Sequence, residues 1–174
     1  EHTIGGKKFD MEIQVIFYGQ TKGDISKQAI VSYLFESSPG YYNSFIDDLD
    51  IQNLPDREIP TKELRKDLLI SKIFKTREST SESILSELSF KPFSFYLYQG
   101  SLTFPPCSEN TQVYVNTEIL KLSPTIIQLF QEAIIEKPKI DRFGNISSST
   151  SVPFSNRSVQ PLNGRKIMFY DHTK

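Results

Sequence analysis

Residues 95–109 read FYLYQGSLTFPPCSE, and the rest of the chain can be placed around this stretch. Its first half is rich in aromatic residues, which favour a pleated β-strand. Gly100 and the double proline Pro105-Pro106 then interrupt the strand with a sharp, rigid loop. The residues themselves therefore predict a strand end followed by a stiff loop that presents the hydroxyl group of Thr103.

Further strands are predicted on both sides of this stretch. Gly5-Gly6 is a turn dipeptide that opens an N-terminal hairpin. Alternating or continuous runs of Ile, Val and aromatic residues then indicate strands. The predicted strands are residues 9–18, 29–35, 93–98, 111–115 and 167–170. We expect the first four of them to belong to a single sheet.

Three segments are predicted to form helices. Pro39-Gly40 turns the chain into a short helix, and Ser123-Pro124 begins a longer one with a hydroxyl N-cap and a proline at the first helical position. Residues 61–83 are rich in charge and serine, with apolar residues at roughly helical spacing, which indicates an amphipathic helix followed by a flexible loop. This segment is either a solvated surface feature or an interface for a partner. The apolar positions are Tyr42, Phe45, Ile46 and Leu49 in the first helix, Ile126, Ile127, Leu129, Phe130, Ala133 and Ile134 in the long helix, and Leu64, Leu68, Ile73 and Phe74 in residues 61–83.

Composition excludes several classes of protein. The 174 residues suit one domain with a sizeable core. A net charge of −1 does not favour nucleic acid or an anionic membrane surface as a partner. No apolar run approaches the ~20 residues of a membrane-spanning helix. The single cysteine, Cys107, cannot form an internal disulfide, and a free cysteine is most often a small buried hydrophobe.

The stretch from Tyr98 to Glu109 resembles the active-site loop of the α-class carbonic anhydrases, and two other segments match the same family in the same order. Residues 1–4 and 8–12 resemble its EHT hairpin, and residues 157–165, RSVQPLNGR, resemble its C-terminal signature. The resemblance implies a mainly β (α+β) fold: a twisted, mostly antiparallel central sheet with short surface helices. It also implies that residues 1–174 are the later part of a single domain, and that residues 61–83 are an insertion unusual for the family.

The family hydrates carbon dioxide at a zinc ion held by three histidines. Two of these ligands would lie upstream of Glu1. The third ligand position, two residues after Glu12, is Gln14 in this chain, and a neutral amide oxygen is a poorer zinc ligand than an imidazole nitrogen. The chain is therefore most similar to the carbonic-anhydrase-related proteins that have lost a zinc ligand, and no cofactor is expected. The alternative is that Gln14 is a tolerated ligand variant and that zinc binds.

The resemblance assigns roles to several further residues. Thr103 and Glu1 match a pair in which the threonine hydroxyl donates to the glutamate. His2, Glu12 and Tyr98 match a buried polar cluster, which must be hydrogen-bonded whether or not catalysis occurs. The pocket for carbon dioxide would be lined by Ile16, Val31 and Leu102, which are equally suitable as core residues.

The resemblance also bears on partners and location. Many secreted relatives pair a cysteine at the position of Cys107 with one near their N-terminus, a region missing here, so a partner outside this sequence is expected for Cys107. Two sequons, at Asn145 and Asn156, permit glycosylation and so favour a secretory or extracellular location. With its neighbour missing, the strand around residues 12–17 would expose an apolar edge. We therefore expect the N-terminal part of the domain, upstream or on another chain, to pair with it.

Two functions follow from these observations. The first is a catalytically inactive, carbonic-anhydrase-like domain that acts as a structural or interaction module with further protein partners. The alternative is a zinc-dependent carbonic anhydrase whose metal ligands are completed by another segment. An intact His-x-His strand upstream would favour the enzyme, and substitutions there would favour the module.

Overall fold

The computed structural model describes residues 1–19, 28–51, 67–74, 76–78, 93–105, 107–134 and 157–171. The chain divides into two compact units. The first unit comprises Glu1–Glu36, Glu82–Lys121 and Asn156–Lys174, and the second comprises Ser37–Ser81 and Leu122–Ser155. Each unit is described by itself.

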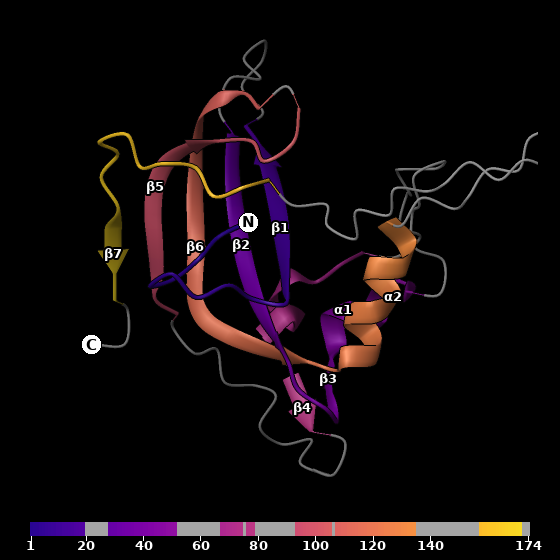
Figure 1. The fold of residues 1–174 in the computed structure, drawn as a ribbon. Helices are drawn as coiled ribbons and strands as arrows, with labels where there is room; N and C mark the ends of the chain where they lie inside the picture. The colour runs from indigo at the N-terminus through magenta and orange to yellow at the C-terminus, as the bar shows by residue number, and fades with distance from the viewer. Residues whose placement is uncertain are drawn as a thin grey trace, which may run out of the picture. The chain divides into compact units, whose positions relative to one another are not determined.

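The first unit is built on a five-stranded sheet with the strand order β1-β2-β6-β5-β7 (Figure 1). The strands are β1 (Met11–Tyr18), β2 (Gln28–Ser37), β5 (Phe95–Ser101), β6 (Glu109–Leu122) and β7 (Met168–Tyr170). The β1/β2, β5/β6 and β5/β7 pairs are antiparallel. The predicted single, mostly antiparallel sheet is confirmed, and all four strands expected to share it do so.

One strand pair runs in the same direction and makes the sheet mixed. At the start of β2 and β6, Thr111 donates its hydroxyl to the side chain of Gln28 over 3.5 Å. Where the two strands end, the backbone N–H of Ser38 donates to the carbonyl oxygen of Leu122 over 2.9 Å. The start of β2 lies beside the start of β6, and their ends also lie together, so the two strands run parallel.

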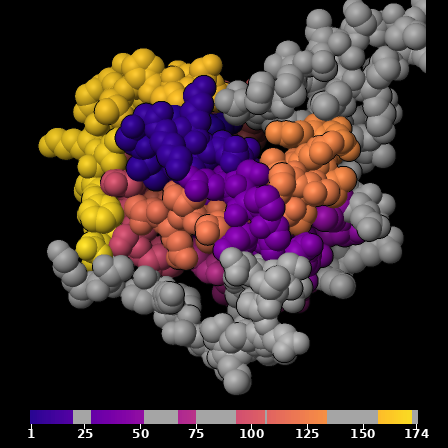
Figure 2. All heavy atoms as spheres, turned by 60° about the horizontal axis from the view of Figure 1, so that its bottom comes forward, coloured from indigo at the N-terminus to yellow at the C-terminus, as the bar shows by residue number. Residues whose placement is uncertain are grey.

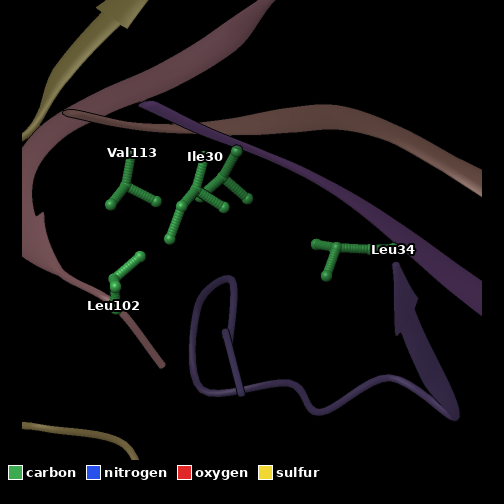
Figure 3. Packing of buried hydrophobic residues seen from close by; sticks show 5 residues of the cluster. Ile30, Leu34, Leu102 and Val113 are labelled. Carbon is green, nitrogen blue, oxygen red and sulfur yellow. The ribbon is translucent and has the colours of Figure 1, made fainter. Parts of the chain in front are cut away.

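Alternation of side chains places one apolar cluster on a single face of this sheet, here called the core face. Ile30 and Leu34 of β2 and Val113 and Val115 of β6 are buried together with Leu102, which follows β5 (Figure 3). Ile16 of β1 lies opposite Ile30 in the strand register and packs against the cluster. The strands thus contribute their core-face positions to a continuous hydrophobic layer.

The predicted pocket residue Val31 is not on this face. It pairs with Val15, one position away from the Ile16–Ile30 pair, so its side chain points to the opposite face of the sheet. Ile30, which is fully buried, occupies the place beside Ile16 and Leu102 that was expected for Val31. The expectation was wrong by one residue, and a one-residue shift reverses the face of a strand residue.

The N-terminal turn forms as predicted. Ile4 and Lys7 form an isolated antiparallel β-bridge, and Gly5 and Gly6 make the two-residue turn between them. Both glycines have positive φ angles, 59° and 80°, as a type I′ turn requires. The turn returns the chain toward β1 and leaves Glu1 and His2 beside the core face, where they enter the candidate site.

The second unit contains β3 (Tyr41–Asn43), α1 (Ser44–Asp48), the 3₁₀ helix η2 (Ile70–Phe74), β4 (Thr76–Glu78) and α2 (Pro124–Ile134). Asn43 caps α1 by accepting from Phe45 and Ile46, and donates to the carbonyl oxygen of Ile73 over 2.7 Å. The α2 helix begins after Ser123 as predicted, with Ile126 and Ile127 buried. No helix within the described ranges is long and apolar enough to span a membrane.

Two expectations for this unit need correction. Tyr42, placed in the first helix, lies in β3, because that segment pairs with β4. Within the described part of residues 61–83, residues 70–74 form η2 and residues 76–78 form β4, where a helix followed by a loop was expected, and Ile73 is fully buried. Residues 61–66, 75 and 79–83 lie outside the described ranges.

The face assignment of β2 gives the first prediction. Ile30→Ala should lower the free energy of unfolding by about 2–5 kcal/mol, because it opens a cavity in a fully buried cluster. The matched variant Val31→Ala, at a half-buried position on the other face, should cost clearly less. Urea denaturation measures both values. An equal or larger loss for Val31→Ala would contradict the assigned register.

Candidate functional site

Five side chains form one hydrogen-bonded chain over the core face, here called the polar chain. Its members come from four separate segments: the N-terminal segment, β1, β5 and the loop after β5. In order they are Tyr98, His2, Glu12, Gln14 and Thr103. All five were singled out from the sequence, and the structure brings them together.

The polar chain bridges strands that are not neighbours. Glu12 is on β1 and Tyr98 is on β5, and β2 and β6 lie between them. Strands are spaced by ~4.8 Å, so three spacings separate β1 from β5 by about 14 Å. The N-terminal segment crosses this gap and supplies His2 as the bridge. The polar chain therefore lies across the face that carries the buried cluster of Ile30, Leu34 and Val113.

His2 and Glu12 form the strongest link of the chain. The backbone N–H of His2 donates to Oε2 of Glu12 over 2.9 Å, and Nδ1 of His2 lies 2.7 Å from Oε1. An ionised carboxylate only accepts hydrogen bonds, so Nδ1 carries the proton. Nε2 of His2 lies 2.7 Å from the hydroxyl of Tyr98. His2 is thus held at both ring nitrogens.

The pKa of Glu12 reflects these contacts. Burial alone would raise it, since the side chain is only 7% exposed. The hydrogen bond and charge of His2, with a further bond from Gln14, outweigh burial and hold the pKa well below its ordinary value of 4.5. Glu12 is therefore an ionised anchor at neutral pH.

Gln14 is fixed at both ends of its amide. Its Nε2 donates to Oε1 of Glu12 over 2.7 Å, and its Oε1 accepts the hydroxyl hydrogen of Thr103 over 2.6 Å. Because Glu12 can only accept, the amide nitrogen must face it, and the amide oxygen must face Thr103. Gln14 therefore acts as a hydrogen-bond link between β1 and the loop.

The expected Thr103–Glu1 pair does not form. Thr103 has a single hydroxyl hydrogen, and Gln14 accepts it. Oε1 of Glu1 instead accepts the backbone N–H of Arg157 over 2.9 Å. The physical reason is the residue at position 14: an amide oxygen competes for the threonine hydrogen, which an imidazole bound to a metal through its nitrogen could not do.

Arg157 contributes to the site, although the sequence analysis gave it no role there. Its backbone N–H holds Glu1, and its guanidinium group donates to the hydroxyl of Ser101 over 2.9 Å and to the carbonyl oxygen of Leu102 over 3.4 Å. It therefore ties the C-terminal segment to the loop that carries Thr103. The only signal was its position at the start of the C-terminal signature, which gave no partner.

A pocket of about 310 Å³ opens beside the polar chain. Its lining combines side chains of the site with apolar residues of the C-terminal segment, including Val159, Leu162 and Ile167. Burial raises the pKa of the Tyr98 hydroxyl against the opposing charge of Arg165, so the phenol stays protonated at neutral pH. Gly100 is required next to it, because a Cβ there would lie 2.7 Å from the Tyr98 ring.

The residues present do not fit a zinc ion on their own. Within the part of the chain that the structure describes, no group of three or more His, Cys, Asp or Glu side chains is placed to hold a metal. At the position where the resemblance predicts the third ligand, the amide oxygen of Gln14 already accepts from Thr103. A zinc ion here would need ligands from outside these residues and would have to compete with that hydrogen bond.

The remaining residues that the sequence analysis assigned to the site lie in the core, at the surface or outside the described ranges. Leu102 is part of the buried cluster and Ile16 packs against it, so both serve as core. Cys107 is partly exposed, with a φ angle of 56°, and its expected disulfide to another segment stays a prediction. The sequon residues Asn145 and Asn156 lie outside the described ranges.

The mainly β fold and the polar chain across its sheet define the class of protein, and comparison with known proteins agrees. A family model described as eukaryotic-type carbonic anhydrase matches residues 1–171, and the chain belongs to this family. It is 29% identical over 170 residues to alpha carbonic anhydrase 8 of Arabidopsis thaliana, covering 98% of this chain and 35% of that protein. It is 25% identical over 178 residues to dioscorin DB3L of Dioscorea polystachya, covering 100% of this chain and 52% of that protein.

A solved structure supports the fold. The crystal structure of a halotolerant carbonic anhydrase from Dunaliella salina superposes with a TM-score of 0.65 at 19% identity, covering 99% of this chain and 57% of that one. The chain thus spans about half the length of the relatives it matches, or less.

The lowered pKa of Glu12 gives the second prediction. Glu12→Gln should destabilise the protein at pH 7 by about 1–3 kcal/mol, since it weakens the bonds that hold His2. The unfolded state takes up a proton near pH 4.5 while folded Glu12 stays ionised, so this stabilisation should decline as the pH falls below 4.5. Urea denaturation between pH 7 and pH 3 measures the difference.

The control for this prediction is Glu109→Gln, which alters an exposed carboxylate at the start of β6. It should change stability little at any pH. A cost of Glu12→Gln that stays constant down to pH 3 would contradict the assignment of Glu12 as the charged anchor.

Proposed function

We propose that this chain is part of a carbonic-anhydrase-like domain that does not hydrate carbon dioxide and acts as a structural or interaction module. The observation that supports this proposal is the state of Gln14. Both ends of its amide are used in hydrogen bonds, to Glu12 and to Thr103, at the position where the family has a zinc ligand.

The chemistry of the family reaction explains why this substitution matters. A catalytic zinc ion held by three protein ligands lowers the pKa of its bound water to ~7 and so supplies hydroxide at neutral pH. A neutral amide oxygen binds zinc more weakly than imidazole does. In addition, Thr103 directs its hydroxyl hydrogen at Gln14, so it cannot orient a reacting group in the way expected from the family.

The intact remainder of the site supports a structural role. Tyr98, His2 and Glu12 are joined by bonds of 2.7 Å, and Arg157 ties the C-terminal segment to the loop after β5. These contacts hold distant segments together without any metal. A fold that keeps such bracing keeps its surface shape, which is what binding to a partner requires.

The first partner that we propose is a polypeptide segment that completes the domain. β1 is the terminal strand of the sheet as described, and Phe17 and Tyr18 at its end are 46% and 52% exposed. Native proteins cover or pair such an edge, because open edges aggregate. We place here a strand from outside residues 1–174, either upstream on the same polypeptide or on another chain. The sequons at Asn145 and Asn156 support a secretory location for the assembly.

The second candidate function is zinc-dependent carbonic anhydrase activity. Membership of the carbonic anhydrase family favours it. It requires metal ligands from outside the described residues and a reorientation of the Gln14 amide away from Thr103.

The third prediction separates the two functions. The natural protein should contain far less than one equivalent of zinc after purification in zinc-containing buffer, and should not accelerate carbon dioxide hydration. Elemental analysis and stopped-flow hydration measure these quantities. Stoichiometric zinc, with hydration activity that is lost in Gln14→Ala, would overturn the proposal.

A pair of variants tests whether position 14 is the cause. Gln14→His should raise zinc affinity only if the two upstream histidines are present in the natural protein. The matched control is Gln99→His, which introduces a histidine at an exposed position of β5. Equal zinc uptake by the two variants would show that the added histidine, and not the site, is responsible.

A further inference from the structure

One side chain on the core face carries a buried hydroxyl group that has no partner. Ser32 lies in β2 between Ile30 and Leu34, and strand residues two positions apart share a face, so its side chain belongs to the core face. Ser32 is fully buried. Its Oγ makes no hydrogen bond within the part of the chain that the structure describes. A polar atom is thus placed in a row that otherwise contributes to the hydrophobic cluster.

A buried hydroxyl in this position is costly unless it is hydrogen-bonded. It loses its hydration on folding, and without a partner nothing replaces the lost bonds. The large majority of buried polar side-chain atoms in proteins therefore bond either to the protein or to ordered water. Alanine would occupy the same place in β2 without this cost. The hydroxyl of Ser32 therefore points to a hydrogen-bond partner.

Gln14 is the residue directly opposite Ser32 in the antiparallel pair of β1 and β2. It lies on the core face with Glu12 and Ile16, and side chains opposed in this way have Cβ atoms ~4.5–5.5 Å apart. The bonds of Gln14 to Glu12 and Thr103 use one of its two amide hydrogens and one of the two lone pairs on its amide oxygen. An unpaired hydroxyl and a half-used amide are therefore cross-strand neighbours.

The two groups suit a bridging water molecule. Ser32 and Gln14 do not bond to each other directly. A polar contact longer than ~3.5 Å is commonly bridged by water, and a buried water needs two to four polar partners. Here a water can accept the second amide hydrogen of Gln14 and bond to the hydroxyl of Ser32, which can donate or accept.

The core face is shielded from bulk solvent. Ile4 and Phe9 of the N-terminal segment pack against the hydrophobic cluster. Figure 2 shows the C-terminal residues (yellow) lying against the N-terminal residues (indigo). Because Ser32 is itself fully buried, a water bound to its hydroxyl would be held as part of the structure.

We infer that a single ordered water molecule binds between the Ser32 hydroxyl and the Gln14 amide on the core face. Ser32 is thus a positioning residue: through this water it holds the amide nitrogen of Gln14 on the side that Glu12 does not occupy. The inference goes beyond the proposed function and does not depend on it. The water uses the amide nitrogen, whereas a zinc ion would take the amide oxygen, so the two can fail separately.

A high-resolution crystal structure of the natural protein tests the water directly. The expected result is one water molecule within ~3.2 Å of both Oγ of Ser32 and Nε2 of Gln14. A direct bond from the Ser32 hydroxyl to a protein group, or the lack of a water in contact with both atoms, would overturn the inference.

Substitution of Ser32 tests its effect on Gln14. Ser32→Ala should shift the NMR resonance of the Gln14 amide proton that does not bond to Glu12, because the water loses its second partner. It should also lower the urea midpoint of unfolding. Ser32→Thr keeps a hydroxyl and should keep that amide resonance close to its natural position. An unchanged amide resonance in Ser32→Ala, or a raised urea midpoint, would count against the bridging water.

The matched control is Thr111→Val, which removes another fully buried hydroxyl at nearly constant size. The hydroxyl of Thr111 bonds to Gln28 and Ser108 and not to Gln14. Its removal should lower stability and leave the amide resonances of Gln14 in place. A shift as large as that in Ser32→Ala would contradict the assigned role, since it would show a general response to the loss of a buried hydroxyl.

Discussion

The hydrogen bond from the Thr103 hydroxyl to the amide oxygen of Gln14 is the interaction on which the site depends. The amide points this way because Glu12 can only accept and so holds the amide nitrogen, which leaves the amide oxygen for Thr103. Glu12 in turn holds His2, and His2 meets Tyr98 across the sheet. Each member can satisfy its neighbour only in one orientation, because a carboxylate cannot donate and a hydroxyl has one hydrogen. An amide at this strand position therefore takes the hydroxyl hydrogen of the threonine, which a metal-bound imidazole could not accept.

This constraint links the sheet to the proposed function. The polar chain spans β1 to β5 over two intervening strands, so it stabilises the arrangement of the whole core face and not a single pair. Glu12 is buried and charged, and a buried charge is tolerated only when it is paired and hydrogen-bonded. The bracing must therefore be kept for the fold to persist, with or without catalysis. A retained polar chain is consistent with an enzyme and with an interaction module, and Gln14 is the residue that favours the module.

Much of the fold could be predicted because its signals are local. The turn at Gly5-Gly6 and the alternation along β1 are written in adjacent residues. The pieces that failed depend on pairing between distant segments. The run around Val31 is apolar at consecutive positions, so it could not reveal which face is buried, and Ile30 took the expected place. β3 pairs with residues of β4 that lie 33 to 37 positions later, and short strands of this kind leave little trace in the sequence. The site residues and the cluster of His2, Glu12 and Tyr98 were found from motifs. The partner of Thr103 was not, since its acceptor is a residue 89 positions away.

The state of the Gln14 side-chain amide in solution tests the central claim most directly. Its two amide protons can be observed by NMR in isotope-labelled natural protein and assigned by their loss in Gln14→Glu. If Gln14 links Glu12 to Thr103, one proton should exchange slowly with solvent, and neither resonance should change when one equivalent of zinc is added or when zinc is removed by a chelator. A stoichiometric, chelator-reversible shift of these resonances on adding zinc would show that Gln14 is a metal ligand and would contradict the account.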